Sequence, residues 1–200
     1  MNIKSIKFVK LHRQLALPLF VPLLLTGISG IAYRLGRSWL GLPKSFGQAM
    51  MTIHEGRFLG EPLVPFYVAL VGLGLLALIG SGAVLWSRFR RRSPAKLPPE
   101  RNIHRFLAPI ALLPLMVSAG TGIAYRLSIN WLGVSEEQVK FLMTLHQGSY
   151  LGSTLRPFYV LLVGAGLIIM LWTGVQMLGL ARRTRRESNQ GSSFKGRQSS

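Results

Sequence analysis

The 200-residue chain has no cysteine and few acidic residues. Without cysteine there are no disulfides, no cysteine-ligated iron–sulfur clusters and no covalent CxxCH attachment of haem. Only six residues are acidic, against 24 lysines and arginines, which gives a formal net charge of +18. The sequence also lacks a nucleophile–base pair, a phosphate-binding glycine loop and paired carboxylates within an apolar segment, so nothing in it favours a hydrolase.

The hydrophobic residues, 49% of the chain, are gathered into long blocks. A helix needs about 20 mostly apolar residues to cross a bilayer. Four segments qualify, and none contains an acidic residue: Leu15–Leu35, Val64–Trp86, Phe106–Leu127 and Phe158–Leu180. The first has no polar cleavage region after it, so we expect a retained span rather than a signal peptide.

Positive charge is concentrated on one side of this predicted topology. Four spans place both termini and the middle linker together, and that side carries 17 of the 24 basic residues. Because short loops rich in lysine and arginine stay in the cytoplasm, we expect both termini to be cytoplasmic. The basic clusters are typical of a topology signal in contact with anionic lipid, so we predict the bilayer as a partner and no nucleic acid.

The chain repeats itself at an offset of 92 residues. GIAYRL occurs at 30–35 and 122–127, WLG at 39–41 and 131–133, and PFYV at 65–68 and 157–160. We therefore predict an all-α polytopic membrane protein whose four transmembrane helices form two parallel tandem repeats. Each repeat reads helix, outer loop helix, helix, and a pseudo-two-fold axis along the membrane normal relates the two copies.

The expected boundaries follow from this repeat. Residues 1–92 form the first repeat, 93–101 an irregular cytoplasmic linker rich in proline, 102–184 the second repeat, and 185–200 a disordered basic tail. Each outer loop should contain a short amphipathic helix. The first is expected from Lys44 to His54, and the second begins with a capping box at Ser135–Gln138 and stops at Gly148.

All four histidines of the chain are repeat equivalents. His12 and His104 begin the first and third spans at the inner surface, and His54 and His146 lie in the outer loops. A two-fold axis along the normal would bring each pair to one depth. Neutral imidazole is a good iron ligand and haem iron takes two axial ligands, so we predict two b-type haems, one bound by each pair. The alternative is that these residues are interfacial histidines copied by duplication.

Four arginines accompany the histidines. Arg13 and Arg105 lie beside the inner pair, and Arg34 and Arg126 lie at the outer ends of the first and third spans. Guanidinium groups pair well with carboxylates, so these residues are candidates for holding haem propionates. Simple anchoring at the membrane interface explains them equally well.

Several short motifs resemble the PepSY-associated transmembrane family of bacterial membrane proteins. They are Leu11-His12-Arg13 at the start of a span, Ile53–Gly56 and Leu145–Gly148 before the next spans, and Gly82, Trp86 and Arg88–Arg92 at a span's end. The resemblance implies a role in iron regulation, a bacterial plasma (inner) membrane location and, as in some siderophore-iron reductases, two b-type haems. Larger members carry an extramembrane PepSY domain, which we do not expect in this chain.

The sequence therefore predicts a di-haem b-type protein that moves electrons across the membrane. Its donor and acceptor are unknown, and ferric iron, a siderophore or a partner protein could accept the electrons. Two alternatives stay open. One is a non-redox membrane anchor or assembly subunit. The other is a component of metal transport or sensing, because Met51 with His54 and Met143 with His146 offer thioether and imidazole ligands on one helical face.

Overall fold

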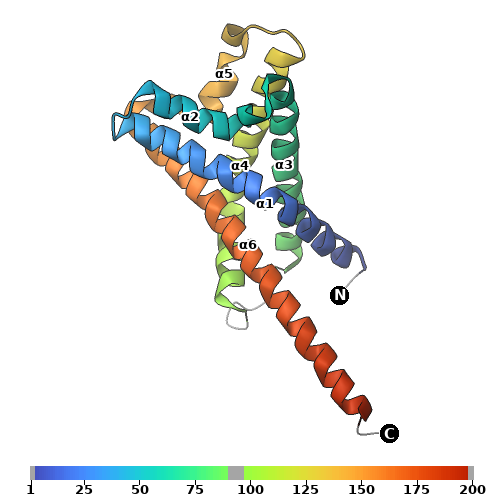
Figure 1. The fold of residues 1–200 in the computed structure, drawn as a ribbon. Helices are drawn as coiled ribbons and strands as arrows, with labels where there is room; N and C mark the ends of the chain where they lie inside the picture. The colour runs from blue at the N-terminus through green and yellow to red at the C-terminus, as the bar shows by residue number, and fades with distance from the viewer. Residues whose placement is uncertain (1–2, 90–96, 198–200) are drawn as a thin grey trace.

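The computed structural model describes residues 3–89 and 97–197 and is helical almost throughout, with no strand among these residues (Figure 1). Its α-helices are α1 (Ile3–Ser38), α2 (Lys44–Glu55), α3 (Val64–Phe89), α4 (Pro99–Asn130), α5 (Glu136–His146) and α6 (Gly152–Arg197). Short 3-10 turns connect them at η1 (Arg57–Leu59), η2 (Glu61–Leu63) and η4 (Ser149–Leu151).

Four of these helices are long and apolar enough to cross a membrane, which confirms the four predicted spans. They cover Lys7–Ser38, Glu61–Arg88, Pro99–Asn130 and Ser149–Gly179. Large apolar side chains point outward from them. Leu70 and its repeat equivalent Leu162, for example, are 69% and 74% exposed. Lipid covers such surfaces, so the chain is a multi-pass membrane protein in contact with the bilayer.

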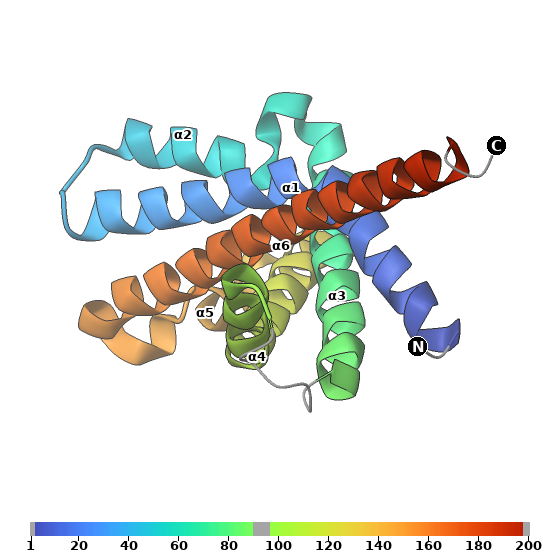
Figure 2. The same cartoon turned by 90° about the horizontal axis from the view of Figure 1, so that it is seen from below.

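The spans pack in the order α1, α3, α4, α6, and each contacts two neighbours (Figures 1 and 2). Close contact between the copies depends on glycine. A Cβ atom on Gly164 would lie 2.6 Å from Ile31, and one on the equivalent Gly72 would lie 2.5 Å from Ile123. Small residues let membrane helices approach in this way. The matching contacts support the pseudo-two-fold axis along the membrane normal, which stays a prediction.

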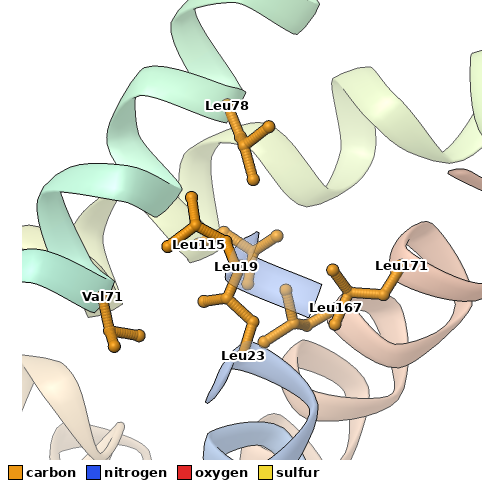
Figure 3. Packing of buried hydrophobic residues seen from close by; sticks show 7 residues of the cluster. All are labelled: Leu19, Leu23, Val71, Leu78, Leu115, Leu167 and Leu171. Atoms are coloured by element: carbon orange, nitrogen blue, oxygen red, sulfur yellow. The ribbon is translucent and has the colours of Figure 1, made fainter. Parts of the chain in front are cut away.

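The buried core lies at mid-height in the bundle. Leu19 and Leu23 of α1 lie between His12 and the outer end of that helix, and leucines from α3, α4 and α6 meet them (Figure 3). The cluster consists of Leu19, Leu23, Val71, Leu78, Leu115, Leu167 and Leu171. Branched apolar side chains therefore fill the space between the levels of the inner and outer histidines.

The outer loops contain the two predicted short helices. The capping box of α5 is present, and the Ser135 amide donates to Gln138 Oε1 at 3.2 Å. Both helices end before a left-handed glycine, Gly56 at φ 72° and Gly148 at φ 66°. A Cβ on either would lie 2.4 Å from a tyrosine ring of the following span, so glycine is required on two counts. This stop places His54 and His146 in the last turn of their helices.

The ends of the spans differ from the sequence-based boundaries. Helix α1 begins at Ile3, so it includes the basic residues that precede the first predicted span. Helix α4 begins at Pro99, inside the predicted 93–101 linker, because proline suits the first position of a helix. Residues 93–96 of that linker, and 90–92 at the end of the predicted first repeat, lie outside the described residues. Helix α6 continues to Arg197 where we predicted disorder from 185 to 200. No proline interrupts the chain after Pro157, so the backbone has no residue that must end the helix.

Candidate functional site

The structure brings the four histidines together as the two predicted pairs. His12 of α1 and His104 of α4 have ring centroids 6.5 Å apart with an interplanar angle of 85°. His54 of α2 and His146 of α5 have ring centroids 6.2 Å apart with an interplanar angle of 76°. Each pair takes one histidine from each repeat, so two residues 92 positions apart face each other at each level.

This spacing suits one metal ion held between two imidazoles. A metal–imidazole bond is about 2 Å long and the nitrogen lies about 1.1 Å from its ring centre, so two rings on opposite sides of one metal have centres about 6.2 Å apart. The outer pair matches this value and the inner pair lies slightly wider. Axial ligation of haem needs this arrangement of two rings.

The hydrogen bonds of the inner pair assign the tautomer of each ring. His12 Nδ1 lies 2.8 Å from Ser81 Oγ, and His104 Nδ1 lies 2.9 Å from Thr173 Oγ1. Both hydroxyls already donate their protons to carbonyls one helical turn back, so their oxygens can only accept from the rings. Nδ1 therefore carries the proton, and Nε2 keeps a lone pair for a ligand.

The outer pair reaches the same state through the backbone. His54 Nδ1 donates to the Thr26 carbonyl at 3.0 Å, and His146 Nδ1 donates to the Ser118 carbonyl at 2.8 Å. A carbonyl oxygen can only accept, which again fixes the proton on Nδ1. Such bonds orient a ring and strengthen Nε2 as a ligand. In all four histidines the unprotonated nitrogen is thus the one available to iron.

Burial keeps the outer imidazoles neutral. It lowers the pKa of His54 to about 4, and the nearby His146 contributes to that shift. Burial also lowers the pKa of His146. A protonated imidazole has no lone pair for a metal, so the lowered pKa values keep both rings in the form that can bind iron at neutral pH.

Glycines lie directly against the histidine rings. A Cβ on Gly30 would lie 3.2 Å from His54 Cε1, and one on Gly122 would lie 3.0 Å from His146 Cε1. At the inner level the corresponding distances are 3.5 Å from Gly82 to His12 and 3.8 Å from Gly174 to His104. Because Gly30 and Gly122 have no side chain, the His54 and His146 rings can lie directly against α1 and α4.

A cavity of about 210 Å³ is lined by the outer pair. Its walls are mostly apolar and come from both repeats, with Met51 and Met143 beside the histidines. Two buried polar atoms on lining residues, Arg34 Nε and Tyr67 Oη, have no acceptor or donor within the described part of the chain. Unmet hydrogen-bonding groups in a cavity call for a polar group on a ligand, and the carboxylates of haem are such groups. The residues present therefore fit a haem at this level.

The predicted outer arginines line the same cavity and each contacts the other repeat. Arg34 Nη2 donates to Gln147 Oε1 at 3.0 Å, and Arg126 Nη2 donates to Glu55 Oε2 at 2.5 Å. Arg34 and Arg126 thus stand at equivalent places but bind different acceptors. Their role in holding propionates stays a prediction.

The inner arginines are less enclosed. Arg13 is exposed, and Arg105 is half-buried one residue after His104. Their predicted contact with propionates also stays a prediction. Among the described residues, no group of three or more histidine, aspartate or glutamate side chains gathers as a metal-ion site.

Sequence reasoning missed the acceptors behind the histidines. Ser81 and Thr173 are repeat equivalents, as are Thr26 and Ser118, and each accepts a bond from the histidine of its own repeat. Both copies keep a hydroxyl side chain at this position, Ser81 and Thr173, and that repetition could have indicated a hydrogen-bond acceptor for the inner histidines. The carbonyl acceptors left no signal, because any residue type supplies a backbone oxygen.

Comparison with known families agrees with this architecture. The profile described as "PepSY-associated TM region" matches residues 34–141, more than half of the chain. The matched range contains one histidine of each pair, His54 and His104. No match was found among curated proteins or among solved structures. With four membrane-spanning helices and this match, the chain belongs to the family of PepSY-associated transmembrane proteins.

Proposed function

We propose that the protein is a di-haem b-type electron-transfer protein of the bacterial inner membrane, with both termini cytoplasmic. The observation that carries the proposal is the pair of facing histidines at each of two levels, with ring centroids 6.5 Å and 6.2 Å apart. All four rings direct an unprotonated Nε2 away from their hydrogen-bonded Nδ1. The arrangement uses every histidine of the chain.

The chain's own residues would bind and orient the two groups. Ser81, Thr173 and two backbone carbonyls hold the rings in place, and the leucine core keeps water out of the space between the levels. Bound between each pair, haem iron would supply one-electron redox chemistry. His12 and Thr26, which marks the level of His54, are 14 residues apart on α1, or about 21 Å along the helix. Two redox groups so placed would span much of a hydrocarbon core about 30 Å thick.

The proposed electron acceptor would bind at the outer surface of the membrane. The outer cavity is lined by Arg34 and by the C-terminal ends of α2 and α5, which lie in the outer loops, so an acceptor outside the membrane would meet the outer group first. We infer that ferric iron, a siderophore complex or a partner protein receives the electron there. The donor would meet the inner group on the cytoplasmic side.

Visible spectroscopy tests the proposal directly. Protein purified in detergent from haem-replete cells should show a b-type reduced-minus-oxidised spectrum and two haems per chain. His54→Ala and His104→Ala should each leave about one haem, and the double variant should leave none. Near-perpendicular imidazole planes also predict a strongly anisotropic low-spin electron paramagnetic resonance signal. A colourless protein from such cells would refute the proposal.

One observation favours a second candidate. Met51 and Met143 line the cavity beside His54 and His146, and soft thioethers with imidazoles suit copper. Metal analysis distinguishes copper binding from haem-based electron transfer. Copper bound stoichiometrically to pigment-free protein, and lost when both methionines are replaced by leucine, would support metal transport or sensing. Pigment-free and metal-free protein that co-purifies with another membrane protein would support an anchor subunit.

A further inference from the structure

The outer cavity is lined by the same set of positions from both copies. Every residue that lines it has its repeat equivalent, 92 positions away, in the same lining. All but three of these pairs are identical in the two copies, including the histidines, the methionines and four tyrosines. The two walls of the cavity therefore present nearly the same side chains to a bound molecule.

The contacts that hold the two walls also match. The Nδ1 bonds of His54 and His146 to backbone carbonyls are 3.0 Å and 2.8 Å long. A Cβ atom on Gly30 would lie 3.2 Å from the His54 ring, and one on Gly122 would lie 3.0 Å from the His146 ring. Each pair of equivalent distances differs by only 0.2 Å, so the walls are alike in geometry as well as in composition.

Three pairs of lining residues differ between the copies: Thr26 and Ser118, Gly27 and Ala119, and Glu55 and Gln147. The third pair differs in charge. The first two pairs are neighbours on α1 and α4, and each differs by one methyl group. The first copy carries its methyl on Thr26 and the second carries it on Ala119, so the two walls hold the same apolar groups displaced by one residue.

This likeness has a consequence for a haem held between His54 and His146, because each face of the ring would meet one copy. Turning haem b over about the line between its two propionates exchanges vinyl groups with methyl groups and leaves the propionates alike. The charge of Glu55 would thus meet the same groups in both orientations. An apolar pocket separates ligands that differ by one carbon by about tenfold at the lower end. Walls that differ only in where a methyl is placed should not exceed that value.

We propose that the outer cavity accepts haem in two orientations, turned over relative to each other, in comparable amounts. The inference rests on the proposed function, because it takes haem as the ligand of the outer histidines. Thr26 with Gly27 on one wall, and Ser118 with Ala119 on the other, set the ratio between the orientations. The site then selects a flat metal tetrapyrrole with two free axial positions, and it does not select the arrangement of the vinyl groups.

Proton magnetic resonance of the ferric protein tests this inference, because paramagnetic iron separates the ring-methyl signals of the two orientations. His104→Ala leaves only the outer site, and His12→Ala serves the same purpose if the first variant does not fold. Haem-free protein is loaded with haem b or with a haem whose vinyl groups are replaced by methyl groups, which turning over leaves unchanged. Haem b should give two sets of signals in a ratio within about tenfold, and the symmetric haem should give one set.

The double variant Thr26→Ser with Ala119→Gly tests the assigned residues. It gives both walls serine followed by glycine, so the ratio for haem b should approach one. Gly120→Ala is the matched control, because a Cβ atom there would meet no atom within 4 Å in the described part of the chain and Gly120 does not line the cavity. That variant should keep the ratio of its parent.

A single set of signals from bound haem b would overturn the inference alone. Two sets from the symmetric haem would do the same, since they would arise from the protein, as would a double variant whose ratio lies further from one. Protein that takes up no haem would refute the proposed function and the inference together. Two orientations of a haem that cannot be reduced would keep the inference and refute electron transfer.

Discussion

Replacing Gly122 by alanine should weaken ligand binding at the outer histidine pair and leave the inner pair intact. The new Cβ would lie 3.0 Å from His146 Cε1 and 3.1 Å from its Nδ1. An ordinary contact between such atoms is about 3.5–4.0 Å, so the ring must move by about half an ångström or more. Its hydrogen bond to the Ser118 carbonyl, 2.8 Å long, opposes that movement.

The size of the effect follows from the cost of overpacking. Inserting a methyl group into a packed site costs about 1–3 kcal/mol, and each 1.4 kcal/mol is about tenfold in affinity. We therefore expect Gly122→Ala to weaken the outer haem site by about 10- to 100-fold. Gly30→Ala, with a closest distance of 3.2 Å to His54, should do somewhat less.

The matched controls are the two inner glycines. A Cβ on Gly82 would lie 3.5 Å from His12 and one on Gly174 would lie 3.8 Å from His104, both ordinary contacts. Because alanine favours helix over glycine by about 1 kcal/mol, these variants should fold at least as well as wild type. Haem titration of each haem-free variant gives the stoichiometry and the two affinities. Equal losses in Gly174→Ala and Gly122→Ala, or no loss in Gly122→Ala, would refute the reasoning.

Three further predictions concern the histidines and their neighbours. Burial lowers the pKa of His54 to about 4 in the folded protein, against 6.5 in the unfolded chain, so the unfolded state binds more protons between these two pH values. The free energy of unfolding of the haem-free protein should therefore fall by about 3 kcal/mol as the pH falls from 6.5 to 4. In denaturant titrations, a His54→Gln variant should show a smaller fall. Ser81→Ala removes the acceptor of the His12 Nδ1 proton, which should weaken the inner haem site by about 1 kcal/mol in the same haem titration, whereas Ser87→Ala should not. Glu55→Gln removes a negative charge from the outer cavity and should make the outer haem potential more positive in a redox titration, while an unchanged potential would show that Glu55 does not act on that group.

Much of the fold could be predicted from the sequence because hydrophobic length and the 92-residue offset are strong signals. Length alone locates the four spans, and the capping box with its glycine stop locates α5. The pairing of His12 with His104 follows once the copies are taken to face each other. The ends of the helices were less predictable, since a helix continues through polar residues until something stops it, as α6 does to Arg197.

The electrostatics of the site could not be read from the repeat. The sequence shows that Glu55 and Gln147 differ, but only the fold shows that each faces an arginine of the other copy. Contacts between the copies depend on how the helices pack, and the sequence of one segment does not determine that packing.

Each histidine pair draws one member from each copy, so neither half of the chain can assemble either site alone. A chain with a single copy would have to associate with an identical chain to form such a pair, and every substitution in it would then appear on both sides of the site. A chain that carries both copies is free of that constraint. Equivalent positions can therefore differ, and Arg126 meets the carboxylate of Glu55 where Arg34 meets the neutral amide of Gln147.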